Sequence, residues 1–264
     1  MYRFLSVLVV AWLCGANLPA VANDAPLRRL LTADEARGWE AVGRVNVQGA
    51  GFCTGTLISP KLVLTAAHCL HFSRTGRPVP ADRVHFLAGW RKDWAAAHRK
   101  ARRIAIHPDF RFETKDQLAK IASDIALVEL EQPIRGSVVE PFAPYGDARP
   151  GDEVVVVSYA RDRSEVPSLQ EPCHLLGRQG AILILSCSAN FGSSGAPVFL
   201  QSEGEMRVVS VITSMTEWNN REVSLGASLT GPLEMLIQQL ETTDPVFRSV
   251  KPGERSALPQ VGVE

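Results

Sequence analysis

Residues 51–69 of this chain read GFCTGTLISPKLVLTAAHC, and they form the most informative pattern in the sequence. Apolar and β-branched residues fill positions 52–58 and 62–64, so the pattern predicts two short strands joined by a turn. The second strand leads directly into His68 and Cys69. The segment therefore combines a strand-rich pattern with two side chains that can take part in chemistry.

Short runs of Val, Ile and Leu recur on both sides of a Pro- and Gly-rich connection at residues 131–152. Many short strands are typical of a barrel or a sandwich, so the predicted fold class is all-β. One amphipathic helix is predicted at residues 232–242, because four apolar residues follow Pro232 at the i, i+3, i+4, i+7 spacing. Residues 94–99 are also helix-prone. The further strand candidates are residues 45–47, 84–88, 103–106, 125–130, 154–159, 181–185, 198–200, 207–212 and 223–227.

The composition is that of an ordinary globular protein, with 264 residues, 45% hydrophobic and 21% charged. The 28 Lys and Arg residues balance the 28 Asp and Glu residues. This balance gives no support to nucleic acid or an anionic membrane surface as a partner. A disordered or fibrous protein is excluded as well.

The first 22 residues fit a secretory signal peptide. Arg3 precedes an apolar stretch at residues 4–13, and the sequence AVA at residues 20–22 forms a small-x-small cleavage site. The apolar stretch is too short for a membrane span, which needs about 20 residues. Bulky residues before Cys14 argue against a lipid anchor there. We therefore predict a secreted or periplasmic protein without stable membrane insertion.

The chain after the signal peptide divides into three parts. Residues 23–38 are either an N-terminal segment of the mature protein or a prosegment that is processed at Arg28-Arg29. Residues 39–244 carry the strand pattern and the predicted helix. Residues 245–264 mix Pro, Gly and charge without a period, which predicts a disordered tail.

Removal of the signal peptide leaves four cysteines: Cys53, Cys69, Cys173 and Cys187. An even number of cysteines in an oxidising compartment predicts two disulfides, for which three pairings exist. Pairing near neighbours would close two short loops, each stabilising the fold by about 3 kcal/mol. A zinc site is the alternative, but the spacing lacks a close Cys-x-x-Cys pair. We expect neither a metal nor a cofactor.

Three segments can together form a nucleophilic site: LTAAHC at residues 64–69, SDIAL at 123–127 and FGSSGAP at 191–197. A serine hydroxyl needs an imidazole to take its proton, and the imidazole needs an acid to fix its tautomer. His68, Asp124 and Ser194 can fill these roles. Glycines on both sides of the serine allow backbone N–H groups to face a developing oxyanion.

The region from residue 39 to residue 240 resembles the chymotrypsin-like (trypsin-fold) serine peptidases, and in particular the secreted bacterial branch that includes the glutamyl endopeptidases. Residues 51–69 match the family's histidine motif, including a disulfide between Cys53 and Cys69. SDIALVEL matches the aspartate motif and GSSGAPVF the serine motif. The order His, Asp, Ser agrees as well.

The resemblance implies two packed six-stranded antiparallel β-barrels with the active site in the cleft between them. The barrels would span about residues 41–130 and 153–230, followed by the C-terminal helix at 232–242. Residues 39–244 would then be one trypsin-like serine peptidase domain.

The resemblance also assigns roles to individual residues. Ser194 is the nucleophile, His68 the general base and then acid, and Asp124 the orienting carboxylate. The N–H groups of Gly192 and Ser194 form the oxyanion hole. The pattern Gly-x-Ser-Gly-x-Pro selects Ser194 over Ser193, so Ser194→Ala should abolish turnover while Ser193→Ala leaves most of it. The substrate pocket is assigned to Ser188, Thr213, Ser214, Met215 and Gly226.

The sequence departs from the family pattern in several places, among them Met215, which replaces a usual Gly. Ser193 replaces the aspartate that pairs with a newly formed N-terminus, which predicts activity without ordered insertion of the N-terminus. Ser188 is not the acid that attracts Arg or Lys, and Ile212 replaces the histidine of the glutamyl endopeptidases. Neither a basic nor a Glu preference is supported.

The predicted function is that of a monomeric secreted serine endopeptidase that hydrolyses peptide or protein substrates through an acyl-enzyme. The alternative is a catalytically inactive trypsin-fold binding protein.

Overall fold

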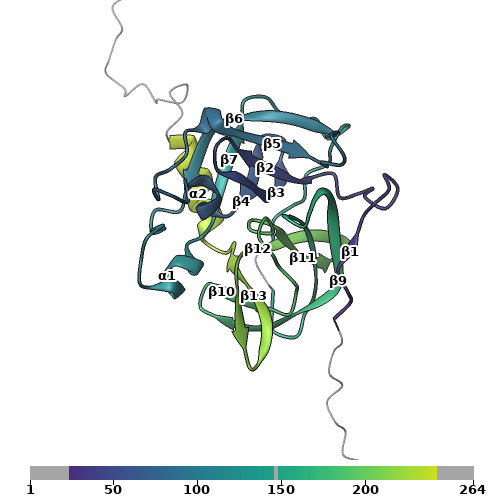
Figure 1. The fold of residues 1–264 in the computed structure, drawn as a ribbon, viewed down its shortest axis with the longest axis vertical. Coiled ribbons are helices and arrows are strands. Elements are labelled where there is room, and N and C mark those ends of the chain that lie inside the picture. The colour runs from purple at the N-terminus through teal and green to yellow at the C-terminus, as the bar shows by residue number, and fades with distance from the viewer. Residues whose placement is uncertain (1–23, 146–147, 243–264) are drawn as a thin grey trace, which may run out of the picture.

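The computed structural model describes residues 24–145 and 148–242. The predicted signal peptide at residues 1–22 and the predicted tail at 245–264 lie outside these ranges. Two antiparallel β-barrels stand one above the other in Figure 1, and the predicted all-β, two-barrel fold is confirmed. Within the described ranges, no helix is long and apolar enough to cross a membrane.

The first barrel is closed, with strand order β2-β3-β4-β7-β6-β5. Inward-facing residues such as Val45, Leu57 and Phe86 are at most 1% exposed and form its core. Short 3-10 turns, η1 (Ala67–Leu70) and η2 (Ala81–Arg83), follow β4 and precede β5. The strands are β2 (Val42–Val47), β3 (Gly51–Ser59), β4 (Leu62–Thr65), β5 (Val84–Ala88), β6 (Ala97–Ile106) and β7 (Ala126–Leu130).

The second barrel has the order β9-β10-β13-β12-β11-β8, and an additional pairing of β9 with β8 joins the two ends of this order. Its own core contains Val156, Leu183 and Val198, each at most 1% exposed. Its strands are β8 (Glu153–Ala160), β9 (Arg163–Gln179), β10 (Ile182–Leu185), β11 (Pro197–Ser202), β12 (Glu205–Trp218) and β13 (Arg221–Ser228).

A shared apolar core joins the two barrels. It contains Leu64 and Leu127 of the first barrel together with Val157 and Phe199 of the second, all fully buried. Because protein interiors are close-packed, this contact allows little relative movement. The shared core therefore joins the two barrels on which the faces of the intervening cleft lie.

Two α-helices complete the fold. Helix α2 (Pro232–Thr242) follows the second barrel in the chain but packs against β6 and β7 of the first, with Leu236 and Leu240 buried (Figure 1). Helix α1 (Gln117–Ala122) is not predicted from the sequence. It begins at an N-cap aspartate, Asp116, whose side chain accepts a hydrogen bond from the Ala119 N–H at 3.0 Å.

The segment that precedes the first barrel is integrated into the second. Strand β1 (Arg28–Arg29) pairs antiparallel with β9, and the next residue, Leu30, is fully buried in the shared core. The Asp24 carboxylate accepts hydrogen bonds from Ser186 Oγ at 2.5 Å and from His174 Nδ1 at 2.9 Å. These contacts make the segment a structural part of the domain.

Leu30→Ala is expected to lower the free energy of unfolding by about 2–5 kcal/mol, because it removes a fully buried side chain and leaves a cavity. Leu31→Ala is the matched control, since Leu31 is 53% exposed and its truncation should change stability by less than about 0.5 kcal/mol. Urea unfolding of both variants measures the difference. Equal stabilities would contradict the docking of this segment.

Candidate active site

Antiparallel pairing between β4 and β7 brings His68 and Asp124 together. The register aligns Leu64 with Leu127 and Thr65 with Ala126. His68 lies in η1, just after β4, and Asp124 lies just before β7, so both residues emerge at the same edge of the barrel. The pairing of β4 with β7 thus joins two residues that are 56 positions apart in sequence.

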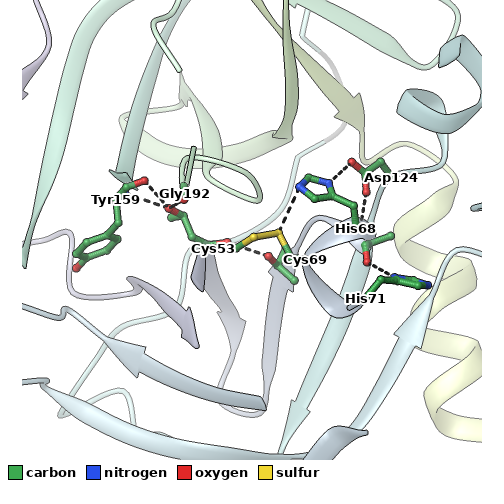
Figure 2. Close-up of a disulfide and its surroundings, with 10 residues drawn as sticks. Cys53, His68, Cys69, His71, Asp124, Tyr159 and Gly192 are labelled. Atoms are coloured by element: carbon green, nitrogen blue, oxygen red, sulfur yellow. Dashed lines mark hydrogen bonds and ion pairs between the residues drawn. A yellow bond between two sulfur atoms is a disulfide. The ribbon is translucent and has the colours of Figure 1, made fainter. Parts of the chain in front are cut away.

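The Asp124 carboxylate contacts His68 twice. Asp124 Oδ2 lies 2.6 Å from His68 Nδ1, and Asp124 Oδ1 accepts the His68 backbone N–H at 2.8 Å. Because an ionised carboxylate only accepts hydrogen bonds, Nδ1 carries the proton and Nε2 is left as an acceptor. Asp124 is 3% exposed, whereas the His68 ring lies between Asp124 and the Cys53–Cys69 disulfide and lines the cleft (Figure 2).

Ser194 and His68 line the same cavity, which has a volume of about 540 Å³ and lies between the barrels. His68 Nε2 is 3.8 Å from Cys69 Sγ, and no hydrogen bond joins it to Ser194 among the described residues. Catalytic hydrogen bonds are often long in ligand-free structures and tighten when substrate binds. The structure therefore places His68 and Ser194 in one cleft, with Asp124 buried beside His68.

The two adjacent serines have different surroundings. Ser193 is 1% exposed, and its Oγ accepts hydrogen bonds from Arg163 Nη2 at 3.1 Å and from the Asn190 N–H at 3.2 Å. Ser194 is half-buried and lines the cleft. The Ser193 hydroxyl thus forms hydrogen bonds inside the second barrel, and Ser194 is the serine that faces the cleft.

The turn that contains Ser194 leaves two N–H groups unused. Ser193 N–H donates to Asn190 O at 2.8 Å and Gly195 N–H donates to Ile212 O at 2.7 Å. In the part of the chain that the structure describes, the N–H groups of Gly192 and Ser194 donate no hydrogen bond. Gly192 has a φ of +100°, a conformation that glycine adopts without strain. Two unused donors beside a nucleophile are suited to stabilise an oxyanion.

Thr54 is a residue of this site that the sequence did not reveal. It is fully buried on β3, its N–H donates to Ser194 O at 2.9 Å, and its Oγ1 donates to Gly192 O at 2.8 Å. The same Oγ1 accepts the Tyr159 N–H at 3.0 Å. Thr54 therefore connects the first barrel to the turn around Ser194. Its only sequence signal is its position directly after Cys53.

The four cysteines form two disulfides, Cys53–Cys69 and Cys173–Cys187. Among the described residues, the one cluster of potential metal ligands is Cys53, His68 and Cys69, within 4.8 Å of one another. Both sulfur atoms of this cluster belong to the same disulfide, so they are not available as thiolate ligands.

The predicted substrate-pocket residues fall into three places. Thr213, Ser214 and Met215 line the cleft together with Ser194. Ser188 lines an adjoining cavity of about 260 Å³, which also contains Met215. Gly226 lies inside the second barrel and lines neither cavity; a Cβ there would lie 2.3 Å from Ser210 Oγ. Gly226 is thus placed for close packing.

Three histidines outside the triad favour their neutral form. Burial lowers the pKa of His71, His85 and His107 below the ordinary value. For His71, the nearby charges of His68 and Lys120 act in the same direction, whereas Asp124 raises the pKa. His71 is 9% exposed and its Nδ1 lies 2.9 Å from Ala67 O.

The free energy of unfolding is expected to fall as the pH drops from 7 towards 5. The unfolded chain binds protons at these histidines near pH 6.5, whereas the folded chain does so only at lower pH, so acid favours unfolding. For each such histidine the slope is at most about 1.4 kcal/mol per pH unit, and it is smallest for His85, which is only partly buried. Urea unfolding across this range, with His71→Asn expected to show a shallower decline, measures the effect. A stability that is constant over this range would contradict it.

The chain belongs to the family of the trypsin-like peptidase domain, whose family model matches residues 53–209, more than half of the chain. The resemblance to trypsin-fold serine peptidases is therefore confirmed. The assignment to the bacterial branch within that family stays a prediction.

Curated relatives of this chain are proteases and a coagulation factor. The cercarial protease of Schistosoma mansoni is 27% identical over 161 residues, which cover 57% of this chain and 58% of the relative. Serine protease 23 of Mus musculus is 27% identical over 184 residues, covering 61% and 48%. Coagulation factor XII of Cavia porcellus is 33% identical over 97 residues, covering 37% and 15%. The chain spans less than two thirds of each relative.

Solved structures share the fold at low sequence identity. A Glu endopeptidase in complex with MPD has a TM-score of 0.68 and 15% identity, covering 84% of this chain and 98% of the other. The thermostable serine protease AL20 has a TM-score of 0.61 and 17% identity, covering 78% and 99%. At these identities the similarity supports the two-barrel fold alone.

Proposed function

We propose that this chain is a secreted serine endopeptidase in which Ser194, His68 and Asp124 form the catalytic triad. The observation that carries the proposal is the paired contact of Asp124 with His68 in a cleft that Ser194 also lines. Membership of the trypsin-like peptidase domain family supports the same reaction class.

The geometry suits an acyl-enzyme mechanism. Ser194 Oγ attacks the carbonyl carbon of the peptide bond while His68 Nε2 accepts its proton, and the N–H groups of Gly192 and Ser194 stabilise the oxyanion. Collapse of the tetrahedral intermediate breaks the C–N bond, and the amine leaves with the proton from His68. Water then attacks the ester with His68 as base, which releases the acid product and restores Ser194.

Main-chain pairing is the proposed basis of substrate binding. Strand β12 pairs with β11 only up to Val211, whereas its pairing with β13 continues to Trp218. Residues 213–215 therefore have a strand edge at the cleft to which an extended peptide can add. Among the described residues, the charged side chains that line the cleft are Arg161 and the titratable His68 and His71. The adjoining cavity that contains Ser188 is also lined by Glu217 and Glu222.

The N-terminal segment is proposed to remain in the active enzyme. Residues 24–30 pair with β9 and contribute Leu30 to the shared core, and Ser193 stands where an activation aspartate would be needed. The chain would therefore become active on folding and signal-peptide removal, in keeping with a secreted or periplasmic location and two disulfides. We also propose that it acts as a monomer.

Labelling with a fluorophosphonate followed by peptide mapping tests the proposed function. The folded, disulfide-bonded protein should be modified at Ser194, and His68→Ala should abolish the modification. Modification of Ser193 would overturn the assignment of the nucleophile. Absence of labelling in correctly folded protein would instead support a trypsin-fold binding protein without activity.

A further inference from the structure

Arg163, the first residue of β9, places a charged group in the interior of the second barrel. The residue is 5% exposed, and no carboxylate among the described residues forms an ion pair with its guanidinium. Its Nε lacks a hydrogen-bond partner. Desolvation lowers the pKa of Arg163 and the nearby charge of Asp162 raises it, but Asp162 forms no direct ion pair with the guanidinium. Burying a cation without a direct ion pair is costly, so the few contacts that it does make are informative.

Those contacts lead to the turn that carries the nucleophile. Arg163 Nη2 donates to Ser193 Oγ at 3.1 Å, and Arg163 Nη1 donates to Ser158 O at 3.4 Å. Ser193 Oγ also accepts the Asn190 N–H at 3.2 Å. The guanidinium is thus connected through one hydroxyl to both ends of the turn from Asn190 to Ser193.

We propose that Arg163 is a positioning residue that holds the turn at residues 190–194 in the conformation in which the N–H groups of Gly192 and Ser194 face the cleft. This inference rests on the proposed serine endopeptidase function. Arg163 acts through Ser193 and does not itself touch the reacting atoms. In family members that are activated by cleavage, a buried aspartate pairs with the newly formed N-terminus. Here Ser193 stands at the position of that aspartate, and the Arg163 guanidinium would take the place of the N-terminal amine.

The neighbours of Arg163 hold the same turn. Arg161 N–H donates to Phe191 O at 2.7 Å, and Asp162 Oδ1 accepts from Asn190 Nδ2 at 3.4 Å. Three consecutive residues that directly follow β8, the last of which begins β9, therefore contact the turn by a backbone group, a carboxylate and a guanidinium. Such convergence is what a preorganised oxyanion hole requires, since its donors must be oriented before the reaction begins.

The burial of Arg163 and the conformation of Gly192 explain why the Arg163–Ser193 hydrogen bond matters. Desolvation lowers the pKa of Arg163, but the ordinary value is so far above neutrality that the guanidinium stays charged. A charged donor makes a stronger hydrogen bond to a hydroxyl than a neutral donor does. Gly192, with a φ of +100°, has no side chain to fix its peptide, so the orientation of the turn depends on contacts from its neighbours, such as the hydrogen bond from Thr54 Oγ1 to Gly192 O at 2.8 Å.

Arg163→Met tests the inference, because methionine keeps an unbranched side chain but removes the charge and the donors. We expect kcat, normalised to the sites titrated by fluorophosphonate, to fall about tenfold with KM within about twofold of wild type. Arg163→Lys should recover part of the loss. The effects of Arg163→Met and Ser193→Ala should be less than additive in the double variant, because both changes remove the Arg163–Ser193 hydrogen bond, whereas Ser193→Ala also removes the one from the Asn190 N–H.

Arg207→Met is the matched control. Arg207 is also an arginine of the second barrel with an unpartnered buried Nε, but it contacts Glu203 and Glu205 and lines none of the cleft. Its kcat per titrated site should equal that of wild type. If Arg163→Met lowers only the melting temperature or the titrated fraction, the residue is merely structural and the inference fails. Failure of the wild-type protein to be labelled at all would instead reject the proposed function.

Discussion

Replacing Ser194 by alanine is expected to abolish turnover, lowering kcat by about 10⁶-fold while the fold is retained. The change removes the only hydroxyl of the adjacent serine pair that lines the cleft, and the acyl-enzyme cannot form without it. Because Ser194 is half-buried at the cleft surface, a smaller side chain should leave the packing intact. Hydrolysis of a peptide ester, together with the melting temperature, measures both parts of this expectation.

Ser193→Ala is the paired control. Ser193 Oγ accepts hydrogen bonds from Arg163 and Asn190 in the interior, so its removal leaves the nucleophile in place. Loss of these hydrogen bonds should slow turnover by at most about tenfold, a larger effect than the serine motif alone predicts, because Ser193 also binds Arg163. If Ser193→Ala is inactive and Ser194→Ala retains turnover, the choice of nucleophile is wrong.

The fold could be predicted from short apolar runs, but the long strand β9 could not. Pro167 and Pro172 lie within Arg163–Gln179, and proline cannot donate a ladder hydrogen bond. Here the carbonyl groups of both prolines accept N–H groups of the N-terminal segment, from Leu30 and Ala25. The two prolines interrupt the strand pattern, so β9 has no local signature although it pairs with its sequence neighbours β8 and β10.

Local propensity also failed at residues 94–99, which are helix-prone in sequence. In the structure β6 begins at Ala97, and its residues pair with β5 and β7. Cross-strand pairing and burial outweigh intrinsic helix preference where a strand closes a barrel. Helix α1 was not predicted, because its six residues are too few to show a clear helical period.

The residues of the candidate site also fall into those that the sequence predicts and those that it does not. His68, Asp124 and Ser194 stand in motifs that the sequence displays, so the triad could be proposed from the sequence alone. Thr54 and Arg163 act through contacts with Gly192 and Ser193 at separations of 138 and 30 residues. Neither contact follows from a period or a motif, since each depends on how the two barrels and the β8–β9 turn meet. Only the three-dimensional structure places these residues at the site.

Asp124→Asn is expected to lower kcat by about 10⁴-fold at neutral pH, with little change in KM or stability. The His68 backbone N–H fixes the side chain, because it needs the carbonyl oxygen of the amide as its acceptor at the Oδ1 position. The amide nitrogen then faces His68 Nδ1 and donates to it. The imidazole is forced to carry its proton on Nε2, where it can no longer accept one from Ser194.

Asp116→Asn provides the matched control for this substitution. Asp116 caps helix α1 with its carboxylate, and asparagine is an equally good N-cap, so activity and stability should both stay near wild type. Steady-state kinetics on a peptide ester and the rate of fluorophosphonate labelling measure the contrast. Asp124→Asn that keeps more than about a tenth of wild-type kcat would mean that the tautomer of His68 does not depend on Asp124. The histidine–aspartate contact would then be structural, and the triad would need a different acid.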